Sequence, residues 1–177
     1  MKRMAIGLLI VFLFSFGCQK KEEQKTSQQG FSGPVQSPGQ LQNQIQLLQD
    51  AVKKNPQDVR GWIQLGNVLM DTARFQEAID AYQRALELDP RNVDVRVDMG
   101  TCYRNMGQPQ KAVEEYKKAI SIDPNHVNAH RNLGVVFAFD LREKKLAVKE
   151  FEEYLRLAPN APDATQVRQI IADLKTS

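Results

Sequence analysis

The residues that could perform chemistry are few and are poorly placed for it. The sequence has only two histidines, His126 and His130, whose spacing of four would put both on one face of a helix. A metal site needs a third ligand, and Asp123 is the nearest candidate. His126, however, falls in an expected turn and His130 at a packing position. We therefore interpret both as structural residues and expect no metal and no cofactor.

Nucleophile and phosphate-binding motifs give no better case for an enzyme. No serine or cysteine stands at a suggestive spacing from a histidine, and no glycine-rich phosphate loop is present. Cys102 falls among apolar packing positions, so we interpret it as a small core residue rather than a reactive thiol. We predict a protein that is not an enzyme and takes no small-molecule substrate.

An internal repeat that begins near residue 41 sets the positions of these residues. Prolines recur at 56, 90 and 124, which are 34 residues apart, and again at 159 after 35 residues. Three other sets keep the same interval, lengthened by one residue in the last step of two of them: Gly66, Gly100 and Gly134; Ala78, Ala112 and Ala147; Tyr82, Tyr116 and Phe151. A period of this length is typical of a solenoid.

Each period contains two amphipathic helices. In the first helix of the first unit the stripe consists of Trp62, Leu65, Gly66 and Leu69, at offsets of 0, 3, 4 and 7. A second stripe runs from Ala78 to Leu86, and Pro90 closes the unit because proline disfavours helix at the residue before it. Neither helix could bury its stripe alone, so each pair needs neighbours to stack against.

These residues resemble the tetratricopeptide-repeat (TPR) signature through Trp62-x2-Leu65-Gly66-x2-Leu69, Ala78-x3-Tyr82 and Pro90. The next two units match in phase, with Arg96 and His130 in place of the tryptophan. The third has one extra residue after Gly134, which we expect in its inter-helix turn near residues 140–145. The resemblance covers about residues 41 to 160 and implies an all-α, right-handed TPR α-solenoid that binds protein or peptide partners.

We divide the chain at the composition changes and repeat boundaries. The predicted parts are a signal peptide at 1–17, a cysteine with a disordered tether at 18–40, a half-repeat helix at 41–58, repeats at 59–92, 93–126 and 127–161, and a capping helix at 162–177. Eight helices are expected. Only Phe31 and Val35 are apolar in residues 19–40, too few to offset the entropy of ordering that segment.

The N-terminus has the pattern of an export signal. A basic head, Lys2-Arg3, precedes 11 apolar residues from Met4 to Phe14, which are too few to span a bilayer comfortably. Ser15-Phe16-Gly17-Cys18 then resembles the lipobox of bacterial lipoproteins, in which the cysteine receives a diacylglyceryl group and further fatty-acyl chains such as palmitate. Ordinary cleavage with release and an uncleaved anchor are the alternatives.

The lipobox resemblance implies a lipoprotein of the cell envelope that faces the periplasm. Gln19 follows Cys18 where an aspartate would resemble an inner-membrane retention signal, which favours the outer membrane. Loss of the signal peptide lowers the net charge from +3 to +1 because Lys2 and Arg3 are removed. A near-neutral chain gives no electrostatic reason to expect a nucleic-acid partner.

The first helices of the repeats should line the inner, concave surface of the solenoid. Twelve residues are predicted to form a peptide-binding groove there: Arg60, Ile63, Asn67, Met70, Asp71, Val97, Thr101, Arg104, Asn105, Arg131, Val135 and Phe139. The apolar members would anchor an amphipathic helix or an extended peptide, which the three arginines would orient. The alternative is that the tether, the cap or tighter packing covers some of them.

The predicted function is a membrane-anchored adaptor or scaffold that captures a protein partner to assist assembly of an envelope complex. Only Asn67 matches the TPR carboxylate clamp, so capture of a C-terminal carboxylate is not expected. One alternative is a cytochrome c maturation-type TPR chaperone, because Asn55-Pro56-x-Asp58-x2-Gly61-Trp62-x2-Leu65-Gly66 resembles the TPR segment of those factors. A self-associating structural protein is the other.

Overall fold

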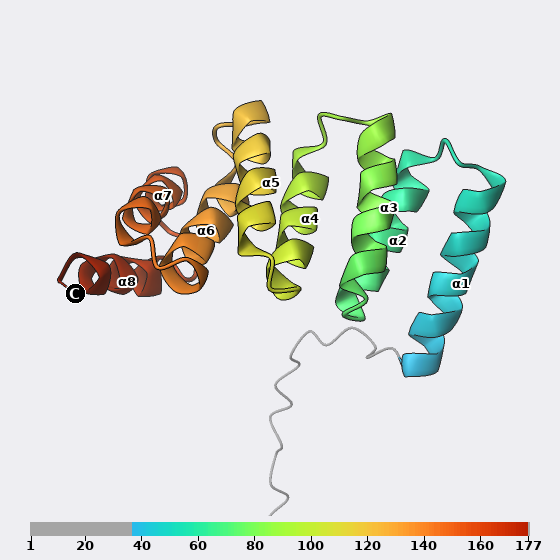
Figure 1. Cartoon of the computed structure of the whole chain (residues 1–177), viewed down its shortest axis with the longest axis horizontal. Coiled ribbons are helices and arrows are strands. Elements are labelled where there is room, and N and C mark those ends of the chain that lie inside the picture. The colour runs from blue at the N-terminus through green and yellow to red at the C-terminus, as the bar shows by residue number, and fades with distance from the viewer. Residues whose placement is uncertain (1–36, 177) are drawn as a thin grey trace, which may run out of the picture. The chain divides into compact units, whose positions relative to one another are not determined.

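A computed structural model describes residues 37–176. The predicted signal peptide, Cys18 and most of the tether lie outside the described residues. Within them the fold is all-α, as predicted, with eight α-helices, one π-helical turn and no strand (Figure 1). The elements are α1 Pro38–Lys54, α2 Val59–Asp71, α3 Phe75–Leu88, α4 Val93–Asn105, α5 Pro109–Ile122, α6 Val127–Val135, η1 Val136–Asp140, α7 Lys144–Leu157 and α8 Ala164–Thr176.

The half-repeat helix α1 begins at Pro38, three residues before the predicted start. Ser37 and Gln40 form a reciprocal capping box, in which the Ser37 N–H donates to Gln40 Oε1 at 2.7 Å and the Gln40 N–H donates to Ser37 Oγ. Proline is well suited to the first turn of a helix because its missing N–H has no intrahelical partner there. The polar residues assigned to the tether therefore include the start signal of the helix.

The three helix pairs α2–α3, α4–α5 and α6–α7 share the same start signal. Asp58, Asn92 and His126 occupy the N-cap of each first helix, and each side chain accepts a hydrogen bond from a backbone N–H of the first turn. Such caps satisfy N–H groups that have no partner within the helix. The histidine in the expected turn is thus explained by its cap position.

The repeated glycines allow an aromatic ring to lie directly on the first helix. A Cβ added to Gly100 would lie 2.6 Å from Cε1 of Tyr116, and one added to Gly134 would lie 2.7 Å from Cδ1 of Phe151. Gly66 faces the ring of Tyr82 in the same way. Each glycine therefore makes space for the aromatic residue of its own second helix, and this contact sets how closely the two helices approach.

The extra residue of the third repeat lies in a helix rather than in the predicted turn. The inter-helix turns contain one left-handed residue each, Ala73, Gly107 and Arg142, so the turn itself keeps its length. The insertion instead widens the end of the first helix into η1, where the Leu141 N–H donates to the Val136 carbonyl at 3.0 Å, five residues back. A π-helical turn absorbs one added residue without breaking the helix, and such turns are frequent at functional sites.

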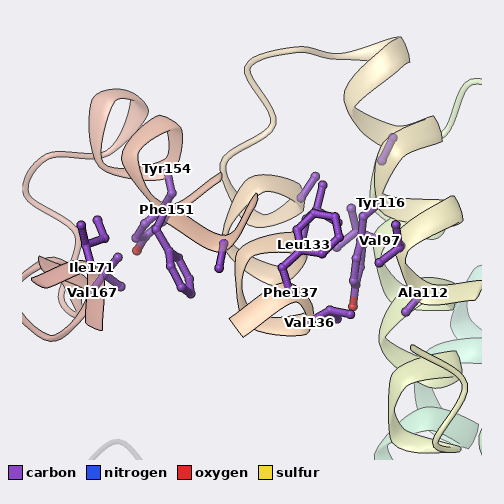
Figure 2. Packing of buried hydrophobic residues seen from close by; sticks show 14 residues of the cluster. Val97, Ala112, Tyr116, Leu133, Val136, Phe137, Phe151, Tyr154, Val167 and Ile171 are labelled. Atoms are coloured by element: carbon purple, nitrogen blue, oxygen red, sulfur yellow. The ribbon is translucent and has the colours of Figure 1, made fainter. Parts of the chain in front are cut away.

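The buried side chains form two clusters along the stack. One centres on repeat 1, and its fully buried members include Leu69, Tyr82 and Cys102. The other joins repeats 2 and 3 to the cap, and Figure 2 shows part of it, with Phe151 and Tyr154 of α7 near Val167 and Ile171 of α8. Cys102 is completely buried, which confirms its interpretation as a core residue.

Candidate functional site

The twelve predicted groove residues define what we call the first-helix face, on α2, α4, α6 and η1. They differ in exposure. Val97 is 5% exposed and belongs to the core, so it offers almost no surface to a partner. The exposed members are Arg60, Asn67, Asp71, Asn105 and Phe139, and the half-buried ones are Ile63, Met70, Thr101, Arg104, Arg131 and Val135.

Hydrogen bonds tie the middle of this face to the second helices in repeats 1 and 2. The Tyr82 hydroxyl donates to Asn67 Oδ1 at 2.8 Å, and the Thr101 and Tyr116 hydroxyls are 3.1 Å apart. Burial raises the pKa of Tyr116 to about 12, so its phenol stays neutral. The matching positions of repeat 3 are Val135 and Phe151, which makes this part of the face apolar.

A pocket beside Val135 and Phe151 lies between repeat 3 and the cap. It has a volume of about 140 Å³ and is lined by Arg131, Val135, Phe139, Phe151, Asp163, Gln166, Val167 and Ile170. Phe139 is 56% exposed, which is unusual for a large aromatic side chain. We call this the repeat-3 pocket. Gln166 and Ile170 belong to α8 and were not predicted, because the sequence does not show how the cap lies against α6.

Two of the three arginines predicted to orient a peptide already have acidic partners. Arg104 Nε lies 2.5 Å from Asp140 Oδ2, and Arg131 Nε lies 2.6 Å from Asp163 Oδ2. The Tyr154 hydroxyl also donates to Asp163, and this bond together with Arg131 lowers the pKa of the Asp163 carboxyl. A partner carboxylate would have to displace these aspartates, so the predicted orienting role does not fit Arg104 and Arg131.

Three carboxylates lie close enough together on α2 and α4 to interact: Asp71, Asp94 and Asp98. Burial of Asp98 on α4, reinforced by Asp94 and Asp71, raises the pKa of its carboxyl to about 6. His126 opposes this shift and bonds to Asp94, with Nε2 2.9 Å from Oδ1. Arg60, the third predicted arginine, is exposed on α2. The sequence shows the charge of Asp98 but not its burial.

The histidines make structural contacts. His130 Nε2 lies 3.0 Å from the Pro124 carbonyl and Nδ1 lies 2.7 Å from Glu150 Oε2, while His126 caps α6. Within residues 37–176 no three His, Cys, Asp or Glu side chains are placed to hold a metal ion. Burial, followed by the nearby Asp98, raises the pKa of the Cys102 thiol to about 12, which disfavours the reactive thiolate.

The three residues at the tryptophan position of the TPR signature make the same hydrogen bond in each repeat. Trp62, Arg96 and His130 each donate a hydrogen bond to the carbonyl of the proline six residues earlier, at 2.9, 3.0 and 3.0 Å. Arg96 and His130 also meet Glu115 and Glu150 on their second helices. The two substitutions of the TPR signature therefore preserve its contact.

A larger cavity lies beside Trp62, where repeat 1 differs from the later repeats on its second helix. Repeat 1 has Ala81 where the later repeats have Glu115 and Glu150. The short side chain leaves a cavity of about 390 Å³ between α1, α2 and α3, whose lining includes Trp62 and Ala81. It contains none of the first-helix-face residues, so it is separate from the predicted site.

The geometry of a TPR stack agrees with sequence comparison. The model of the family described as the TPR domain of cytochrome c-type biogenesis protein H matches residues 25–165. The chain belongs to this family. TPR domains are generally non-enzymatic adaptors, and the comparison indicates no catalytic family. No curated protein matches the chain.

Solved structures support the TPR fold. The crystal structure of MamA is 20% identical, with a TM-score of 0.72 over 78% of each chain. The first TPR of Spaghetti (RPAP3) bound to the HSP90 peptide SRMEEVD is 25% identical, with a TM-score of 0.62 over 67% of this chain and 94% of that one. The Sgt2 TPR domain from Aspergillus fumigatus is 27% identical, with a TM-score of 0.60 over 67% of this chain and 78% of that one.

The described helices do not include a membrane span. From residue 37 to 176, none combines the length and the apolar character needed to cross a bilayer.

Proposed function

We propose that this TPR protein is a membrane-anchored adaptor of the bacterial cell envelope that binds a peptide or helix of a protein partner on its first-helix face. The observation that carries the proposal is the exposed Phe139 beside the repeat-3 pocket, with Ile63, Met70 and Val135 only half-buried on the same face. Apolar side chains gathered on one face are typical of a protein-binding surface.

The anchor is the second part of the proposal and depends on Cys18. Lipid on this residue would hold the adaptor at the membrane, with the outer membrane favoured by Gln19. Fatty-acid labelling of the native protein beside Cys18→Ala tests this part. Labelling lost in the variant supports the anchor, and equal labelling of both proteins contradicts it.

Partner capture tests the binding face. The variant Ile63→Ala/Val135→Ala/Phe139→Ala should keep its helical content and lose at least about tenfold in affinity, because three apolar anchors are truncated. The matched control is Glu87→Ala/Glu114→Ala/Leu146→Ala, at positions exposed on second helices. Equal capture by the two folded variants would contradict the proposed face.

A role in cytochrome c maturation is the more specific candidate and is favoured by the family match. In it, the captured partner would be a c-type apocytochrome or another maturation factor. Deletion of the gene should then reduce the haem-stained c-type cytochromes of the cell, and restoration should require an intact first-helix face. Unchanged haem staining would reject this candidate and leave the general adaptor in place.

A further inference from the structure

The first-helix face is electrostatically asymmetric. We propose that it selects a partner segment with a bulky apolar side chain, which docks in the repeat-3 pocket beside Phe139, and with lysine or arginine residues, which face Asp71, Asp94 and Asp98. This inference rests on the proposed function and specifies the chemistry of the partner. An acidic segment is the alternative that the paired arginines disfavour.

The two arginines of the first-helix face in repeats 2 and 3 are already paired with aspartates of the chain. Arg104 makes two hydrogen bonds to Asp140, at 2.5 and 3.3 Å, and Arg131 bonds to Asp163. A carboxylate of a partner would have to break one of these pairs to gain an arginine. The exchange replaces one ion pair by another and therefore adds little affinity.

Among Asp71, Asp94 and Asp98, only Asp94 has an ion-pair partner within residues 37–176, which is His126. Asp98 has no hydrogen-bond partner among the described contacts, and Asp94 and Asp71 both lie close enough to hinder its ionisation. The side chain of Asp94 is 87% exposed although it bonds to His126. A cationic side chain placed here would relieve the mutual repulsion of the three carboxylates.

The π-helical turn builds the apolar end of the same face. Phe139 and Asp140 are consecutive residues of η1, and Phe139 lines the repeat-3 pocket while Asp140 bonds to Arg104. Repeats 1 and 2 have no π-helical turn. The helix that carries the inserted residue thus provides both the exposed Phe139 and the aspartate that pairs with Arg104. Repeat 3 is therefore expected to prefer an apolar side chain of the partner.

The test uses two synthetic probes and the whole mature protein. One probe is an 18-residue amphipathic peptide of leucine and lysine with blocked ends, and the other has glutamate in place of every lysine. Fluorescence anisotropy at physiological salt should give at least about tenfold tighter binding of the lysine probe, since opposite charges face each other. Equal affinities, or tighter binding of the glutamate probe, would overturn the inference.

Two variants assign the effect to the face. Asp71→Asn/Asp94→Asn/Asp98→Asn should remove most of the preference, whereas Asp80→Asn/Glu87→Gln/Glu114→Gln, which neutralises three exposed carboxylates on second helices, should keep it. Phe139→Ala should lower the affinity for the lysine probe about fivefold or more. A preference that survives the first variant, or is lost equally in the second, rules out the acidic end as its source.

The native partner separates failure of this inference from failure of the proposed function. If the Ile63/Val135/Phe139 variant loses the partner but the three-aspartate variant keeps it, the adaptor function stands and the charge preference is wrong. If both variants keep the partner, the proposed binding face itself is wrong. Loss in both supports the inference.

Discussion

Asp140 of the π-helical turn holds Arg104 of α4 through two hydrogen bonds, with Oδ2 2.5 Å from Nε and Oδ1 3.3 Å from Nη2. The two residues are 36 positions apart and join repeat 2 to repeat 3. The sequence predicts that Arg104 contacts a ligand. In the structure Arg104 instead links repeat 2 to repeat 3 through this ion pair.

Replacement of Asp140 tests how much the Arg104–Asp140 pair contributes to stability and whether it shields Arg104 from a partner. Asp140→Asn should lower the free energy of unfolding by only about 0.5–1 kcal/mol, because the pair is partly exposed to solvent. The variant should also bind the glutamate probe more tightly, since Arg104 is released. Urea denaturation and anisotropy give the two values, with Glu114→Gln as the control. Unchanged binding of the glutamate probe would show that the pair does not shield Arg104.

Asp98 gives a pH-dependent prediction. Its pKa is raised to about 6 in the folded protein, so the folded state binds this proton more tightly than the unfolded state. The stabilising contribution is complete below about pH 4, the ordinary range for aspartate, and is lost as the pH rises through about 6.

Asp98→Asn should therefore match the parent protein near pH 4 and exceed its free energy of unfolding by about 1 kcal/mol at pH 8, after allowance for solvent screening. Urea denaturation at several pH values measures the difference, and the exposed Asp80→Asn serves as the control. A difference that is constant with pH would mean that Asp98 ionises normally.

Gly100 gives a packing prediction. Gly100→Ala places a Cβ 2.6 Å from the Tyr116 ring, so the helices must separate and the free energy of unfolding should fall by about 2–3 kcal/mol. Gly39→Ala is the matched control, because a Cβ there meets nothing within 4 Å. It should leave stability unchanged or raise it by up to about 1 kcal/mol. Equal effects at the two glycines would contradict the contact.

His130 and Glu150 should behave as a coupled pair. His130→Trp alone should destabilise the protein by about 2–4 kcal/mol, because Glu150 loses its buried partner and lies where repeat 1 has Ala81. Adding Glu150→Ala recreates the Trp62–Ala81 combination and should recover at least about 1 kcal/mol of the loss. Thermal or urea unfolding of the double-mutant cycle measures this coupling, and additive effects would mean that the two positions are independent.

The sequence predicts the fold well because its signals are local and periodic. The 34-residue spacing of Gly66, Gly100 and Gly134 reports a contact that recurs in every repeat, so it fixes the helix pairs and their stacking. The start of α1 was missed although its signal is present, since Ser37, Pro38 and Gln40 were assigned to a polar tether by composition.

The binding face was predicted less completely because its properties depend on contacts between distant residues. Helical phase identifies Arg104 and Arg131 on the face, but only the structure shows that Asp140 and Asp163 reach them. Helical phase also cannot show that Val97 is buried in the core that joins repeats 2 and 3. The place of an inserted residue is likewise ambiguous in sequence, since a longer turn and a π-helical turn have the same length.

The most direct measurement is site-specific photocrosslinking in the native cells, with a photoreactive phenylalanine analogue at position 139 and, as the control, at position 114 on α5. Both side chains are exposed, and the analogue resembles the native residue at Phe139. The proposed face predicts a discrete adduct with one envelope protein from position 139 and none from position 114. An adduct from position 114 alone, or the same adduct from both positions, would contradict it.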